Sequence, residues 1–288
     1  MKLLPTLRRR LATWLLRRPS DAAAVALPLD AIANRPWFSS PFGTTPRAPA
    51  ERYEQLAAEA RAKDYPAVDA WESAAGFAID RDWFHDLARL TQIVIKTSEL
   101  CYQHGRLLYS AVRRRIAADS LRHLNILESG TARGFSSLCM ARALADAGAS
   151  GTIITFDVLP HRVPMLWNCV RDLDGPCTRA ELLAAYADLV ERYVVFHQGD
   201  TRLEMPKVKP GRVHVAFLDG AHTYDDVMIE FGCVREAQAP GDVVFFDDYT
   251  ADFPGVVQAV DEITSRQGYR RELIEAGPRR YVCATRER

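Results

Sequence analysis

The spacing of hydrophobic residues changes near residue 123 and divides the chain into two kinds of structure. Between residues 51 and 116, apolar residues recur every three or four positions without strict alternation, which predicts two to four helices. After His123, short apolar runs alternate with helix-like segments. This second pattern is typical of a parallel sheet with helices on both faces, so the sequence predicts an α/β fold preceded by a helical region.

Seven short apolar runs are the predicted strands of this sheet. They lie at 125–129, 152–158, 193–198, 213–219, 242–247, 270–275 and 280–285. The last two are joined by Gly277 and Pro278, and this turn is too short for the crossover that a parallel pair requires. We therefore expect a Rossmann-like, seven-stranded, mostly parallel sheet with its last strand antiparallel.

The first fifty residues differ from the rest of the chain. Residues 1–18 carry six basic and no acidic side chains, and residues 19–49 are rich in proline, alanine and serine. Arginines at positions 17 and 18 interrupt the apolar run that a cleaved signal or a membrane span requires. Residues 1–18 are compatible with a solvated or partner-docked helix, with peripheral contact to an anionic membrane, or with a transit-type leader. The expected domains are a basic helix and arm at 1–50, a helical cap region at 51–120 and a Rossmann-like domain at 121–288.

Composition narrows the class of partner. Lysine plus arginine and aspartate plus glutamate both number 37, so no net charge favours nucleic acid. The six cysteines form no CxxC pair, which indicates reduced thiols in a cytoplasmic protein rather than disulfides or a zinc site. We expect a small-molecule partner, and the sequence leaves open a homo-oligomer.

The clearest local motif is ILESGTARGFSSL at residues 126–138. An apolar strand reaches Glu128, the chain turns through Gly130 and Gly134, and a helix opens near Phe135. Glycines let a ligand approach the backbone, and a helix N-terminus presents free N–H groups to it. The motif therefore predicts a nucleotide-type site, although a purely structural connection can use the same turn.

The end of the next strand indicates which cofactor this turn holds. Asp157 follows that strand, where a carboxylate can accept hydrogen bonds from ribose hydroxyls. Domains for NAD and for S-adenosylmethionine both combine a glycine turn with such an acid. The pattern here is ExGxxxG without GxGxxG, and no YxxxK pair is present, so a methyl donor without a pyrophosphate is favoured.

Five strand ends together resemble those of a known family. ESGTARGFSS, Asp157, HQGD, LDGAHTYDDV and FFDDYT look like class I S-adenosylmethionine-dependent methyltransferases, and most like the methyltransferase-24 group, relatives of macrolide-sugar O-methyltransferases. The resemblance spans residues 94–286 and implies that Asp157 holds the ribose while Gly199 and Asp200 face the adenine. The cofactor-binding residues that it implies are Glu128, Gly130, Thr131, Gly134, Ser136, Asp157, Gly199, Asp200 and Asp219. For Asp200, capping of a short helix is the alternative.

Three aspartates follow the fourth and fifth predicted strands and should meet at one edge of the sheet. Asp219, Asp247 and Asp248 would repel each other unless they were protonated or joined by a cation. Their oxygens suit Mg²⁺, Mn²⁺ or Ca²⁺, and we expect a metal, most simply magnesium, bound by all three. In the metal-dependent O-methyltransferases that this arrangement resembles, the ion lowers the pKa of substrate hydroxyls. The DGAH and DD segments depart from the catechol-type pattern. The sugar-modifying relatives share the DD form, and this resemblance tilts the expected acceptor toward a vicinal diol on a glycosyl or polyketide-like molecule.

His222 comes three residues after Asp219 and is the candidate general base, with Asp219 as its catalytic partner. The alternative is that His222 caps the following helix or binds a neighbouring loop. Asp225 and Asp226 are interpreted as first-turn residues of that helix.

Two further segments could contribute to the substrate site. His104 and Tyr102 could line the pocket or serve only in helix packing. Residues 161–186 exceed what a simple crossover requires and are expected to form a substrate-side cap or a plain helical insertion. They contain Trp167, Asn168 and Arg179.

The sequence therefore predicts a metal-assisted O-methyltransferase that uses S-adenosylmethionine. One rival is a non-heme iron hydroxylase of the cephalosporin-hydroxylase-like type, whose sequences share a DGxH segment. A second rival is a non-catalytic module that binds a membrane surface through the basic N-terminus.

Overall fold

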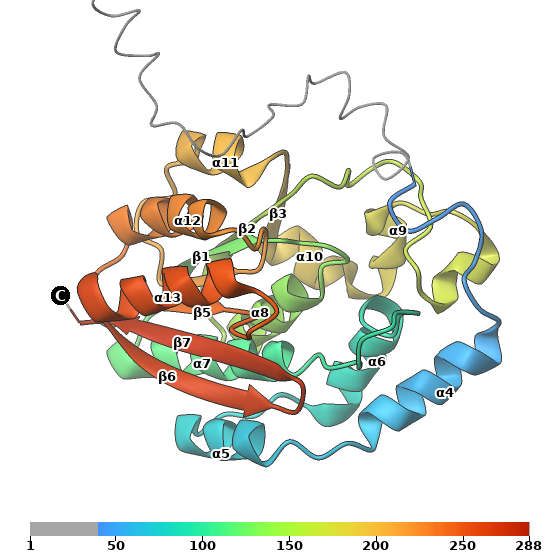
Figure 1. The fold of residues 1–288 in the computed structure, drawn as a ribbon, viewed down its shortest axis with the longest axis horizontal. Helices are drawn as coiled ribbons and strands as arrows, with labels where there is room; N and C mark the ends of the chain where they lie inside the picture. The colour runs from blue at the N-terminus through green and yellow to red at the C-terminus, as the bar shows by residue number, and fades with distance from the viewer. Residues whose placement is uncertain (1–39, 288) are drawn as a thin grey trace, which may run out of the picture. The chain divides into compact units, whose positions relative to one another are not determined.

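The computed structural model describes residues 40–287, and Figure 1 shows its central sheet between layers of helices. The basic helix and membrane contact predicted for residues 1–18 lie outside the described part. Within residues 40–287, no helix has the length and apolar character that crossing a membrane requires.

Within the described residues, seven strands form one sheet in the order β3-β2-β1-β4-β5-β7-β6. Strands β1 to β5 run parallel, and β7 is antiparallel to both of its neighbours. This confirms the predicted mostly parallel sheet with an antiparallel last strand. The strands are β1 (His123–Ser129), β2 (Ser150–Asp157), β3 (Val194–Gln198), β4 (Val215–Leu218), β5 (Val243–Phe246), β6 (Tyr269–Ala276) and β7 (Arg279–Arg286).

The helical region before the sheet contains four helices, at the upper end of the predicted number. Local signals delimit them: the Asp80 side chain accepts a hydrogen bond from the Trp83 N–H to begin α6, and Gly76 ends α5 in a left-handed conformation. The helices are α4 (Ala50–Arg61), α5 (Pro66–Ala75), α6 (Arg81–Thr91), α7 (His104–Asp119), α8 (Phe135–Asp146), α9 (Arg179–Leu182), α10 (Ala187–Tyr193), α11 (Thr201–Glu204), α12 (Tyr224–Glu236) and α13 (Pro254–Arg266). Short 3₁₀ helices occur at η1 (Val170–Asp174), η2 (Ala184–Tyr186) and η3 (Met205–Lys207).

Each face of the sheet has its own hydrophobic core. Phe217 and Phe245 point into a core that also includes residues of α5 to α8, whereas Leu218 and Phe246 point into a core with α12 and α13. Figure 1 shows α5 and α7 on one side of the sheet and α12 and α13 on the other. Because successive strand residues face opposite sides, the apolar runs of β4 and β5 are buried on both faces.

Strand register brings the candidate site residues to one edge. Ser129 pairs with Phe156 on one side and with Leu218 on the other, and Leu218 pairs with Phe246. The residues that follow these positions therefore leave the sheet together at its carboxyl edge, where ligands bind in open α/β sheets.

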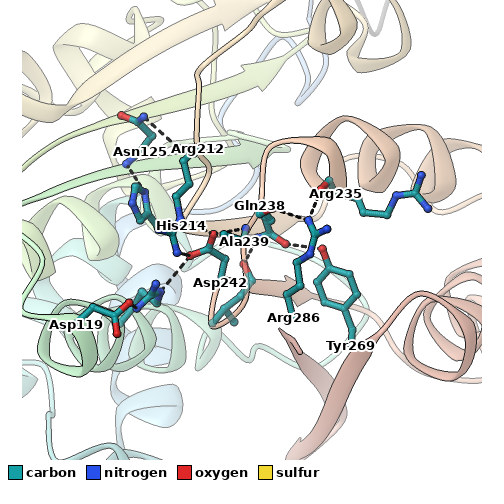
Figure 2. Close-up of polar contacts among 12 residues, drawn as sticks. Asp119, Asn125, Arg212, His214, Arg235, Gln238, Ala239, Asp242, Tyr269 and Arg286 are labelled. Carbon is teal, nitrogen blue, oxygen red and sulfur yellow. Dashed lines mark hydrogen bonds and ion pairs between the residues drawn. The ribbon is translucent and has the colours of Figure 1, made fainter. Parts of the chain in front are cut away.

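A buried ionic cluster stabilises the opposite edge of the sheet (Figure 2). The Asp242 carboxylate is fully buried and accepts hydrogen bonds from Arg115 at 3.1 Å and from Arg212 at 2.8 and 3.0 Å. It also accepts the Ala239 N–H at 2.7 Å. Arg115 comes from α7, so this carboxylate joins a helix of the first region to the loop before β5.

We expect Asp242→Ala to lower the free energy of unfolding by about 3 to 5 kcal/mol, because it leaves the buried Arg115 cation without its buried partner. Urea denaturation followed by circular dichroism measures the change. The control is Asp119→Ala, which removes the exposed partner of the same arginine and should have a much smaller effect. Equal effects of the two substitutions would contradict the conclusion that the buried Asp242–Arg115 pair stabilises the fold more than the exposed Asp119–Arg115 pair.

Candidate active site

The loop after β1 depends on glycine at two positions. Gly130 has a φ of 87°, and a Cβ atom there would lie 2.1 Å from the Asp219 carbonyl oxygen. Gly134 has a φ of 88° and is the N-cap residue of α8. Only glycine adopts such backbone angles freely while leaving this space, so the loop after β1 can lie directly against the loop after β4.

Glu128 lies beneath this loop and faces the protein interior. Its side chain is fully buried and accepts hydrogen bonds from the hydroxyl groups of Ser136 and Ser137 at the start of α8. Burial raises the pKa of this carboxyl group, while the serine hydrogen bonds oppose that rise. Glu128 therefore joins the end of β1 to the first turn of α8, which is a supporting position.

A cleft of about 440 Å³ lies at the carboxyl edge of the sheet. The residues predicted to bind the cofactor that line it are Gly130, Asp157, Gly199, Asp200 and Asp219. The cleft thus extends along the ends of β1 to β4, the path that the sequence predicts for a nucleoside-containing ligand.

Asp157 is held in place by the backbone on both sides of it. One oxygen accepts the Ala132 N–H at 2.5 Å and the other accepts the Leu159 N–H at 2.8 Å, and Arg179 lies 3.9 Å away. Burial raises the pKa of Asp157, and these donors act in the opposite direction. The carboxylate is therefore oriented at the wall of the cleft before any ligand arrives.

Asp200 has two structural roles. It is the N-cap residue of α11, and its side chain accepts the Arg202 N–H at 2.9 Å, as the helix-capping alternative predicts. It also lines the cleft.

A smaller cavity of about 180 Å³ adjoins the cleft and shares Gly130 and Asp219 with it. Thr131, Ser136 and His104 also line this cavity. The His104 ring stacks on Phe217 with 5.7 Å between the ring centroids, and burial lowers its pKa to about 3, so it is neutral. Tyr102 is buried and bonded to His85 at 2.9 Å, which corresponds to the helix-packing alternative.

Asp219, His222 and Asp248 gather where the loops after β4 and β5 meet. One candidate ligand atom from each of the three lies within 4.8 Å of the others. His222 Nε2 is 3.0 Å from Asp248 Oδ2 and 4.0 Å from Asp219 Oδ1. The hydrogen bond to Asp248 raises the pKa of His222, although burial opposes it. Phe253 packs on the imidazole ring with 4.6 Å between centroids, so the ring is held between this aromatic and Asp248.

The structure excludes helix capping by His222, while the hydrogen bond from His222 to Asp248 corresponds to the predicted alternative in which His222 binds a neighbouring loop. Thr223 is the N-cap residue of α12, accepting the Asp226 N–H at 3.2 Å, so His222 does not cap the helix. Asp225 and Asp226 lie in the first turn of α12, as predicted.

Asp247 is not part of the group around His222. One of its oxygens accepts the Asp248 N–H at 2.6 Å, and the other accepts a hydrogen bond from Arg279 Nη1 at 3.0 Å. The same nitrogen lies 2.8 Å from Asp248 Oδ1. A cation from the protein therefore joins two of the three aspartates, and the arrangement does not fit a metal held by Asp219, Asp247 and Asp248 together.

Sequence reasoning missed Arg279. This residue follows the Gly277-Pro278 turn. The turn predicts that the last two strands form a hairpin, but it does not predict which other strand the hairpin pairs with. Because β7 lies between β5 and β6, its first residue comes next to the end of β5.

Sequence reasoning also missed Glu230, which lies below the cleft. Its buried carboxylate accepts hydrogen bonds from Ser129 and Thr201, each at 2.7 Å. It therefore links α12 to the ends of β1 and β3, and no local pattern in α12 distinguishes it from other helix residues.

The insertion between β2 and β3 packs on the glycine loop. Arg179 donates to the Ala132 carbonyl at 2.9 Å, and the Asn168 amide bonds the backbone of Ile95 through both its oxygen and its nitrogen. Trp167 is fully buried in a small cluster of its own. The insertion thus supports two segments that border the smaller cavity.

Comparison with known proteins gives one family match and several similar solved structures. Residues 127–249 match the model of a methyltransferase-domain family, methyltransferase-24. No curated protein matches the sequence. The O-methyltransferase NovP is 18% identical, covers 70% of this chain and 88% of its own, and superposes with a TM-score of 0.51. Cofactor-bound Rv0187 from MTB has 20% identity, coverage of 78% and 92%, and a TM-score of 0.48. TomG from Streptomyces achromogenes has 19% identity, coverage of 76% and 98%, and a TM-score of 0.49.

The matched segment contains the glycine loop, the cleft-lining aspartates and the group around His222. The similarity to NovP supports the fold. Residues 127–249 therefore match the methyltransferase-24 domain model, as the resemblance of these residues to that family predicts, and the sheet has the Rossmann-like fold expected of it.

Proposed function

We propose that the protein transfers the methyl group of S-adenosylmethionine to a hydroxyl group of a small-molecule or glycosyl acceptor. The observation that carries this proposal is the position of His222. It lies 3.0 Å from Asp248 and near Asp219, a residue that borders both the cleft and the smaller cavity. A base next to a donor site is the arrangement that methylation of a hydroxyl group requires.

The donor would lie along the cleft. Asp157 would accept hydrogen bonds from the ribose hydroxyls, and Gly199 with Asp200 would border the adenine. The methionine end would cross Gly130 toward Thr131 and Ser136 in the smaller cavity. Glu128 and Gly134 would act by positioning the loop and α8.

The reaction requires proton removal and an in-line displacement. In this proposal His222 would donate its Nε2–H to Asp248, 3.0 Å away, which would leave Nδ1 to accept the proton of the acceptor hydroxyl. The acceptor oxygen would then bond to the methyl carbon as the carbon–sulfur bond breaks, with S-adenosylhomocysteine as the leaving group. Asp248 stabilises the imidazolium that forms, and catalysis otherwise comes from holding oxygen, carbon and sulfur in line.

The predicted magnesium ion supplies no step of this mechanism, because Asp247 and Asp248 are paired with Arg279. The iron-hydroxylase alternative would use Asp219, His222 and Asp248 as ligands, and cofactor binding distinguishes it from methyl transfer. The membrane-module alternative depends on residues 1–18, outside the described part.

We expect calorimetric titration with S-adenosylmethionine to show binding to the full-length protein and a dissociation constant raised at least about tenfold in Asp157→Ala. The loss of hydrogen bonds to a charged acceptor accounts for this size of effect. The control is Asp82→Ala, a highly exposed position on α6, which should bind like the unsubstituted protein. Absence of binding in the unsubstituted protein would refute the proposed function.

For His222→Gln we expect methyl transfer to fall about 10²- to 10⁴-fold, because glutamine cannot accept the hydroxyl proton. Binding of S-adenosylmethionine should stay within about twofold, since the ring does not line the cleft. Release of S-adenosylhomocysteine in the presence of a panel of diols measures the rate. His123→Gln, an exposed histidine at the start of β1, is the control. An unchanged rate in His222→Gln would remove this residue from the mechanism.

A further inference from the structure

Three aspartates converge where β4 and β5 end, and their negative charges need a partner. Asp247 is almost fully buried, with 2% of its side chain exposed, and Asp248 has 12% exposed. Carboxylates this close to each other and this far from water stay ionised only beside a positive charge. The identity of that charge decides how the site works.

Arg279 supplies this positive charge from the protein itself. The guanidinium lies 3.0 Å from Asp247 and 2.8 Å from Asp248, and it lines the smaller cavity next to Asp219. Its place is set by the backbone: the Tyr249 N–H donates to the Arg280 carbonyl at 3.1 Å, which joins the loop after Asp248 to the start of β7. Arg279 is therefore held at the site by the backbone contact of its neighbour and by its two ion pairs.

Arg279 occupies oxygens with which Asp247 and Asp248 would bind a metal in the predicted three-aspartate site. An ion held by Asp219, His222 and Asp248 would share Asp248 with the guanidinium. Asp247 uses one oxygen for the Asp248 N–H and the other for Arg279, and Asp248 divides its oxygens between Arg279 and His222. A divalent ion bound by these aspartates would have to displace the guanidinium or remain beside it. The positive charges of the ion and of the Arg279 guanidinium would then repel each other strongly, because the site is partly buried.

We propose that Arg279 is the resident cation of this site and takes the charge-balancing place of a divalent metal, so that the protein works without one. The proposal rests on the proposed methyl transfer for its role in catalysis. The exclusion of metal by Arg279 does not depend on that function.

The test is titration of the full-length protein with Mn²⁺ alone, followed by electron paramagnetic resonance. We expect the unsubstituted protein to bind Mn²⁺ with a dissociation constant weaker than about 1 mM, and Arg279→Met to bind at least about tenfold more tightly, because the carboxylates lose their cation. Arg279→Lys, which keeps a positive charge, should not gain this binding. Adding Asp247→Asn to Arg279→Met should abolish the gain.

Arg280→Met is the matched control, since Arg280 is adjacent, half exposed and paired with Glu275 instead. Stoichiometric Mn²⁺ binding by the unsubstituted protein below about 100 µM would overturn the proposal, and this result does not require any variant to fold. Equal Mn²⁺ affinities of the unsubstituted protein and a folded Arg279→Met would also overturn it. A separate titration with S-adenosylmethionine tests the proposed function, so the two failures are distinguishable.

Discussion

The close approach of two loops at the carboxyl edge of the sheet is the constraint on which the rest of the site depends. Parallel pairing of β1 with β4 brings Gly130 against the Asp219 carbonyl, and no side chain fits between them. The cleft and the smaller cavity meet at this contact, because both are lined by these two residues. A donor in the cleft and a base near Asp219 can therefore lie next to each other.

Support for this contact comes from buried polar groups below it. Glu128 joins β1 to α8 through two serine hydroxyls, and Glu230 joins α12 to the ends of β1 and β3. Burial raises the pKa of both carboxyl groups. Carboxyl groups buried this fully need hydrogen-bond donors, and these donors come from different elements, so each glutamate fixes the relative positions of the parts that it joins.

Buried charges are paired at both edges of the sheet, but the numbers of acidic and basic side chains are reversed between them. At the amino edge, one buried aspartate, Asp242, accepts hydrogen bonds from two arginines. At the carboxyl edge, one arginine, Arg279, joins two aspartates and keeps 27% of its side chain exposed. The first cluster is closed and structural. The second borders a cavity, so its charges remain available to a ligand.

The sequence by itself determined the strands, the helices, the glycine loop and the acidic strand ends. These features depend on local periodicity and on residues close together along the chain, and the observed strands lie within a few residues of the predicted ones. Only the tertiary structure decided that Glu128 faces the interior and that Arg279 pairs with Asp247. These residues are brought to their partners by helix packing and by insertion of β7 between β5 and β6, and neither is encoded by spacing along the chain.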